Sequence, residues 1–128
     1  MHMQGVSYTR FLLYGFFAYA TIFMLWSLLA AYGMNYGWGA QIVSYVVTGI
    51  AIAVATRALD VVAPQTALLC GAGWVILHTL LDALYVAPTA GFGPFLTSYV
   101  WIAYAIVFFS PVATVLYMKL LKQPAPAQ

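Results

Sequence analysis

Residues 66–86 read TALLCGAGWVILHTLLDALYV, an almost wholly apolar run that contains one formal charge, Asp82. The hydrocarbon core of a bilayer needs about 20 predominantly apolar residues per helix. Pro64 lies just before this run, where the start of a helix tolerates proline best. The run therefore predicts a membrane-spanning helix.

Three further runs of similar length and character cover residues 11–32, 40–58 and 99–118. The chain has 128 residues, of which 66% are hydrophobic and 5% charged, whereas a soluble domain is about a quarter charged. This composition excludes a disordered chain, a nucleic-acid-binding module and a secreted disulfide scaffold. We expect an all-α membrane protein: one domain, residues 1–122, forming a four-transmembrane-helix up-down-up-down bundle with consecutive helices adjacent and the third inside, and a disordered tail at 123–128.

The positive charges predict the orientation of this bundle. Arg10, Arg57, Lys119 and Lys122 all fall at the ends where the first and third helices begin, and the two opposite loops contain no Lys or Arg. The positive-inside rule then predicts an N-in/C-in, multi-pass protein of a bacterial inner (plasma) membrane, with both termini cytoplasmic. As an alternative, the first run is a cleaved signal peptide, although it is about twice the length of a typical signal core. Arg57 and Asp60 are expected to form a local ion pair.

The third helix carries its polar residues on one stripe. At spacings of three and four residues the stripe comprises Gly71, Trp74, His78, Asp82 and Tyr85. The stripe should face protein, and Leu69, Ile76, Leu80 and Leu84 should face away from it. His78 and Asp82 are four residues apart, so we expect their side chains to meet and share a proton or a salt bridge.

Polar residues of the other helices fall at a similar depth. They include Ser27 and Tyr99, and together with the third helix they define a candidate polar pocket for a ligand or a proton. Its proposed members are Asp82, His78, Trp74, Tyr85, Gln41, Ser44, Tyr45 and Tyr104. Either this layer holds the bundle together, with Asp82 accepting hydrogen bonds from Gln41, a tyrosine or loop amides, or it is a protonatable or ligand-binding pocket open to the outside.

Two other patterns predict helix geometry. Gly49, Ala53 and Arg57 follow one another at four-residue spacing, which favours close helix packing or an oligomer interface. Pro111 predicts a kink in the fourth helix, where the Ser110 or Thr114 hydroxyl can satisfy the carbonyl that proline releases.

Several chemistries have no support in the residues. The chain contains no glutamate, and its spans contain one histidine, so we expect no metal, no cofactor and no catalytic residue. The leading hypothesis is that the protein is a non-enzymatic structural or accessory component. We expect its partners to be the lipid bilayer and either further copies of itself or a larger membrane complex, and we expect no nucleic acid. The alternative is a homo-oligomeric small channel or proton-linked transporter around His78 and Asp82, and a third reading makes that pair the base of a membrane enzyme.

The stretch from Gly71 to Met118 carries a family resemblance. Its features are Gly73-Trp74, Leu81-Asp82, Val86, Pro88, Gly91, Tyr99, Tyr104 and Pro111. It resembles small bacterial four-helix membrane proteins of unassigned function, in which a Trp-containing helix reaches a Leu-Asp pair and a Pro-Gly loop before a last helix with Tyr and Pro. The resemblance implies the same topology and points to Asp82, and it implies no activity.

Overall fold

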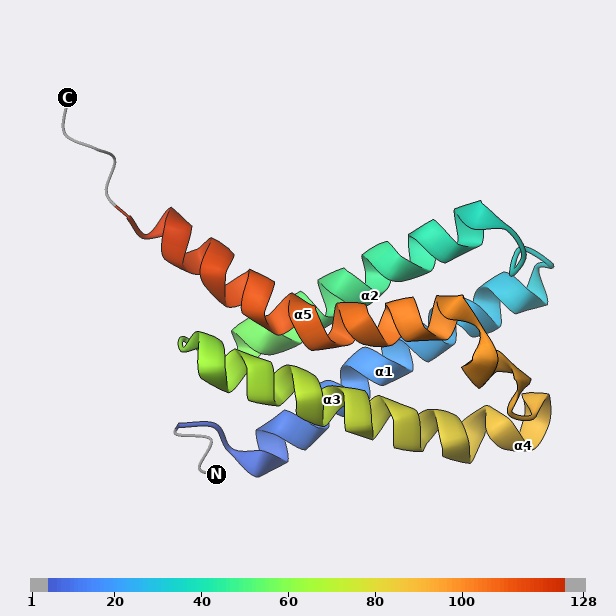
Figure 1. Cartoon of the computed structure of the whole chain (residues 1–128), viewed down its shortest axis with the longest axis horizontal. Helices are drawn as coiled ribbons and strands as arrows, with labels where there is room; N and C mark the ends of the chain where they lie inside the picture. The colour runs from blue at the N-terminus through green and yellow to red at the C-terminus, as the bar shows by residue number, and fades with distance from the viewer. Residues whose placement is uncertain (1–4, 124–128) are drawn as a thin grey trace.

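The computed structural model describes residues 5–123 and is helical, with no strand in that range (Figure 1). The four long helices are α1 (Tyr8–Ala31), α2 (Trp38–Ala58), α3 (Pro64–Tyr85) and α5 (Ser98–Leu121); the short α4 (Ala87–Ala90) and the 3-10 turn η1 (Gly93–Leu96) connect α3 to α5. Each long helix is long and apolar enough to cross a membrane. The prediction of four helices with the length and apolar composition of membrane spans is confirmed. Apart from Gln123, the predicted tail lies outside the described residues.

Two residues with positive φ set the ends of α2. Gly37 precedes the helix with φ 90°, a conformation that favours glycine. Asp60 follows it with φ 55°, and its backbone N–H donates to the carbonyl of Arg57 at 3.0 Å. The expected Arg57–Asp60 ion pair is wrong for the described part of the chain. Because Asp60 has left the helical path, it no longer has the geometry that brings residues three apart together.

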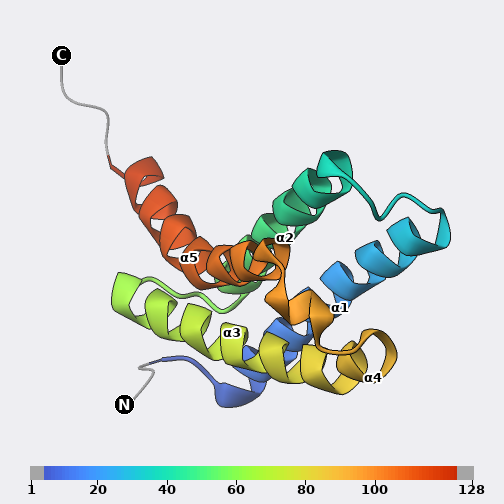
Figure 2. The ribbon, with the colours of Figure 1, turned by 45° about the vertical axis from the view of Figure 1, so that its right-hand side comes forward.

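The long helices form a ring in the spatial order α1, α2, α5, α3. The extensive contacts join α1 to α2, α2 to α5, α5 to α3 and α3 to α1 (Figure 2). Chain direction alternates along the sequence, so α1 begins and α5 ends at the same end of the bundle (Figure 1). The up-down-up-down alternation agrees with the prediction.

The predicted adjacency fails for α2 and α3, which are consecutive in sequence but diagonal in the ring. The link between them is the reason. Leu59 and Val61 are only 4% and 3% exposed and belong to the hydrophobic core, so the link crosses the end of the bundle through the core instead of turning back on α2. The expectation that the third helix lies inside is also wrong, because the four long helices form a ring with none at its centre, and α2 and α3 are buried to a similar extent.

The face of α3 that meets the other helices is the predicted stripe. Gly71, Trp74 and His78 are buried and Asp82 is partly buried, but the prediction is wrong for Tyr85, which is exposed at the end of the helix. Of the side chains predicted to face away, Ile76, Leu80 and Leu84 are exposed and Leu69 is partly buried. At Gly71 the backbones of α3 and α5 are in close contact, because a Cβ there would overlap the Phe108 carbonyl oxygen. Trp74 is fully buried and lies in the main hydrophobic cluster. This packing positions the polar residues described next.

Candidate functional site

A regular series of three polar contacts joins α1 to α3. The indole Nε1 of Trp74 donates to the carbonyl of Phe11 at 3.0 Å, His78 Nε2 contacts the carbonyl of Gly15 at 3.1 Å, and the Tyr19 hydroxyl donates to Asp82 Oδ1 at 2.8 Å. In every case the two residues are 63 positions apart. We call these three contacts the α1–α3 ladder. Since its members advance by four residues on both helices, it follows one turn after another of two helices that run in the same direction.

Glycine on α1 makes the middle of the ladder possible. A Cβ at Gly15 would lie 2.5 Å from Nε1 of Trp74 and 2.9 Å from Leu77. The absence of a side chain there lets the indole and the imidazole approach the α1 backbone. Ring packing reinforces the same contacts: Phe11 and Trp74 stack with centroids 5.6 Å apart, and the rings of Tyr19 and His78 pack in a T-shaped arrangement with centroids 5.3 Å apart.

Asp82 extends the ladder to a third helix. The Tyr104 hydroxyl, from α5, donates to Asp82 Oδ2 at 2.6 Å, while Tyr19 donates to Oδ1. Each carboxylate oxygen therefore has a hydroxyl donor, and the two donors come from different helices. Within residues 5–123 no buried side-chain nitrogen or oxygen lacks a hydrogen-bond partner. The arrangement meets the requirement that a polar group inside an apolar bundle be hydrogen-bonded.

His78 makes its polar contact with α1 and not with Asp82. A carbonyl only accepts, so the contact with Gly15 places a proton on Nε2 of His78. In the described part of the chain no hydrogen bond or ion pair joins His78 to Asp82. The prediction that these two side chains share a proton or a salt bridge is therefore wrong. The cause is the ladder, in which each turn of α3 is matched to a turn of α1, so the two side chains reach separate partners.

A second set of contacts surrounds the Tyr99 hydroxyl. Trp26 of α1 donates its indole N–H to this hydroxyl, and the hydroxyl is also hydrogen-bonded to Ser44 of α2. The ring of Tyr45 stacks on that of Tyr99 with centroids 5.2 Å apart. We call Trp26, Ser44, Tyr45 and Tyr99 the Tyr99 cluster. It joins α1, α2 and α5, as Asp82 joins α1, α3 and α5.

The proposed pocket residues are therefore divided between two sets of contacts, with two residues outside both. Asp82, His78, Trp74 and Tyr104 belong to the ladder and its extension; Ser44 and Tyr45 belong to the Tyr99 cluster; Gln41 and Tyr85 belong to neither. The Gln41 side chain makes no hydrogen bond to any residue from 5 to 123. Tyr85 is 55% exposed, with its ring 6.5 Å from that of Phe23.

Two contributors from α1, Tyr19 and Trp26, were not predicted. The four-residue spacing of Phe11, Gly15 and Tyr19 matches that of Trp74, His78 and Asp82, and this shared spacing is the sequence signal for the pairing. Trp26 has no comparable signal, since it is one of many aromatic residues on α1.

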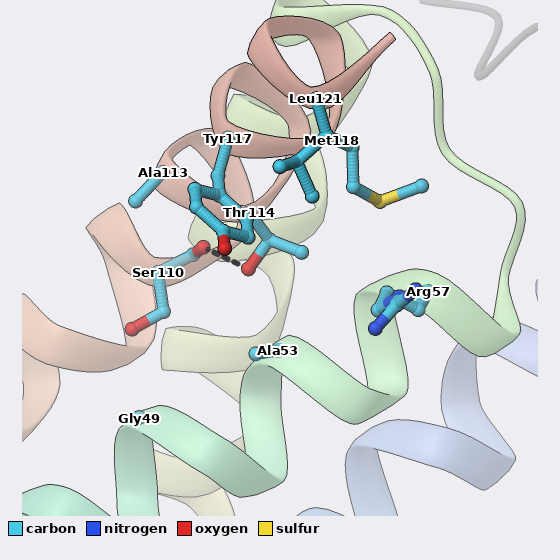
Figure 3. A pocket seen from close by; sticks show the side chains of 9 residues that line it. All are labelled: Gly49, Ala53, Arg57, Ser110, Ala113, Thr114, Tyr117, Met118 and Leu121. Atoms are coloured by element: carbon cyan, nitrogen blue, oxygen red, sulfur yellow. Dashed lines mark hydrogen bonds between the residues drawn. The ribbon is translucent and has the colours of Figure 1, made fainter.

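A hollow of about 390 Å³ lies between α2 and α5, towards the end where α2 ends (Figure 3). We call it the α2–α5 groove. Gly49, Ala53 and Arg57 line it from α2, so this small-residue stripe borders a hollow along part of its length instead of packing closely as expected. Among residues 5–123 no group of three His, Cys, Asp or Glu side chains is placed to hold a metal ion.

The far wall of the groove is the part of α5 from Ser110, just before its proline, to Leu121. Pro111 lies inside α5 and is buried, and α5 changes direction part-way along its length (Figure 1). The Thr114 hydroxyl donates to the Ser110 carbonyl at 2.8 Å, whereas the carbonyl that a proline releases lies four residues before it, at Val107. The hydroxyl therefore back-bonds within its own turn, an arrangement that often bends helices.

Comparison with known proteins gives no relative: no family model, curated protein or solved structure matches the chain.

Proposed function

We propose that this small multi-pass membrane protein is a non-enzymatic structural or accessory component of a bacterial plasma membrane, with both termini cytoplasmic. In this proposal Asp82 is a structural residue that fixes the arrangement of three helices. The protein acts alone, as a homo-oligomer or within a larger membrane complex, in contact with the lipid bilayer.

The observation that carries the proposal is the pairing of both Asp82 oxygens with Tyr19 and Tyr104. An ionisable side chain within a bilayer costs a few kcal/mol on insertion scales. Donors from two other helices offset that cost only when the bundle is assembled, so the carboxylate favours one arrangement of α1, α3 and α5. The neighbouring His78 and Trp74 are engaged by backbone carbonyls in the same way.

A homo-oligomeric channel or proton-linked transporter around His78 and Asp82 is the second candidate. It is favoured by the partial exposure of Asp82. The other charged residues of the long helices lie in the turns at the helix ends, so Asp82 is the only formal charge farther inside one. Four helices are few for a monomeric carrier, so this candidate requires self-association.

Asp82→Asn distinguishes the two candidates, with Asp60→Asn in the α2–α3 link as the matched control. An amide presents only one acceptor oxygen, so one tyrosine hydroxyl loses the acceptor for its proton. Under the structural proposal, Asp82→Asn lowers the free energy of unfolding in mixed micelles by about 1–2 kcal/mol, and vesicles holding the unsubstituted protein conduct no more protons than empty vesicles. If the vesicles conduct protons and Asp82→Asn abolishes the flux without loss of folded protein, the structural proposal is rejected in favour of the second candidate.

The orientation has its own test. Single cysteines placed in the α1–α2 loop and after α5, in a chain with Cys70 replaced by alanine, are exposed to an impermeant maleimide on intact spheroplasts. We expect labelling in the loop only. Labelling after α5 in intact spheroplasts would contradict the N-in/C-in topology.

A further inference from the structure

We propose that the α2–α5 groove is a binding site for an anionic phospholipid, with one acyl chain in the groove and the phosphate at Arg57.

The shape of the groove suits an acyl chain. Its floor consists of Gly49 and Ala53, which present almost no side chain, and its opposite wall includes Ala113, Tyr117 and Leu121 (Figure 3). These side chains are mainly apolar, and the volume of about 390 Å³ falls in the range of small-molecule sites. Small residues on α2 and the bend in α5 leave a furrow on the side of the helix pair that would face lipid in a membrane.

Charge at one end of the groove suits a phosphate. Arg57 lines the groove in the last turn of α2, is exposed, and makes no hydrogen bond or ion pair with residues 5–123. A guanidinium can bind two phosphate oxygens at once. In phosphatidylcholine the positive charge of the choline group repels the guanidinium and opposes this binding. Arg10 at the same end is engaged differently, because its guanidinium donates to the Ala58 carbonyl at 3.0 Å.

Two further cations lie close to this end. A second hollow of about 220 Å³ shares Met118 with the groove and is lined by Lys119 and Lys122. Asp60 is the one carboxylate side chain in this part of the chain. The three cations, Arg57, Lys119 and Lys122, form no ion pair within the described residues, so the local charge is positive. Basic pockets between helices at the cytoplasmic side of membrane proteins characteristically hold anionic headgroups. The geometry therefore combines an apolar furrow with a phosphate-binding cation at its end.

The test is native mass spectrometry of the detergent-solubilised protein titrated with phosphatidylglycerol or phosphatidylcholine of the same acyl chains. We expect phosphatidylglycerol to bind about fivefold more tightly. Arg57→Gln should remove this preference, and Arg57→Lys should keep most of it. Equal affinities for the two lipids in the unsubstituted protein, or an unchanged preference in Arg57→Gln, would overturn the proposal.

A second pair of variants tests the acyl-chain part of the site. Ala53→Leu fills the groove without changing the charge and should weaken the binding of both lipids, whereas Val54→Leu, at a neighbouring position that is exposed and does not line the groove, should not. If Ala53→Leu binds both lipids as before, the acyl chain does not lie in the groove.

Inorganic phosphate serves as the last probe. Its failure to compete with phosphatidylglycerol supports a lipid ligand, and full competition overturns that assignment in favour of a free anion.

Discussion

Tyr19 of α1 donates its hydroxyl to Asp82 of α3 across the same 63-residue offset that separates Gly15 from His78 and Phe11 from Trp74. Of these three contacts, the Tyr19–Asp82 contact alone involves two side chains. The other two use backbone carbonyls, which every residue possesses. The contact between Tyr19 and Asp82 is therefore the one hydrogen bond of the ladder whose α1 partner can be removed by changing a side chain.

Tyr19→Phe should lower the free energy of unfolding by about 1 kcal/mol, because Asp82 Oδ1 loses its hydroxyl donor while the ring packing on His78 is kept. Unfolding in mixed detergent micelles measures the effect, with Tyr32→Phe as control because Tyr32 is 76% exposed and lies beyond α1. Tyr104→Phe removes the donor to Oδ2, and the double variant should be non-additive, since both hydroxyls serve one carboxylate. Strict additivity would contradict a shared site.

Gly71→Ala should be among the most destabilising single-methyl changes in the protein. The added Cβ would overlap the carbonyl oxygen of Phe108, a backbone atom that moves only if α3 and α5 separate. Overpacking of this kind costs about 1–3 kcal/mol. Gly39→Ala is the matched control, because a Cβ at this helical glycine meets nothing within 4 Å and should leave stability equal or improved. Equal effects at the two positions would exclude the close approach of α3 and α5.

Trp74→Phe isolates the first contact of the ladder. Phenylalanine keeps an aromatic ring against Phe11 but lacks the N–H that reaches the Phe11 carbonyl, and it leaves part of a fully buried site empty. We expect a loss of about 2 kcal/mol, from the hydrogen bond and the cavity together. Trp38→Phe, at an 81% exposed indole, should change the unfolding transition by less than about 0.5 kcal/mol. A loss at Trp38 as large as at Trp74 would disagree with this structure.

Cys70 reports on the integrity of the core. It is the only cysteine in the chain and is fully buried, so a maleimide in mild detergent should label it only as fast as the bundle unfolds. A Cys70→Ala chain that carries Gly93→Cys in η1, where the backbone is exposed, should react at once. Adding Tyr19→Phe to the unsubstituted chain should speed the labelling of Cys70 in proportion to the stability lost. Rapid labelling of Cys70 in the folded protein would show that the core is open.

Local features of the sequence were sufficient to predict four helices long and apolar enough to span a membrane, and most of the α3 stripe that packs against other helices. Hydropathy and length identify a membrane helix without knowledge of its neighbours, and four-residue spacing places Trp74, His78 and Asp82 on one face. The order of the helices in the ring was not predictable in this way. It depends on the link that buries Leu59 and Val61, and short links favour adjacent helices unless their side chains enter the core.

The partners of the polar residues were predicted only in part. A tyrosine donor for Asp82 was expected, but Tyr19 was not singled out among the aromatic residues of α1. The acceptors for Trp74 and His78 are carbonyls of Phe11 and Gly15, which carry no residue-type signal at all. What the residues alone could not supply is the relative register of two helices, and that register determines which atoms meet.

The ring order also divides the molecule into two hairpins, one of α1 and α2 and the other of α3 and α5, which dock side by side. During synthesis the first hairpin emerges before its partner exists. Tyr19 then has no carboxylate and Trp26 has no tyrosine hydroxyl, because Asp82 and Tyr99 are still to be translated. The polar contacts of the first hairpin are thus completed only when α5 has been made, and a chain that stopped before α5 would leave the Trp26 indole without the Tyr99 hydroxyl.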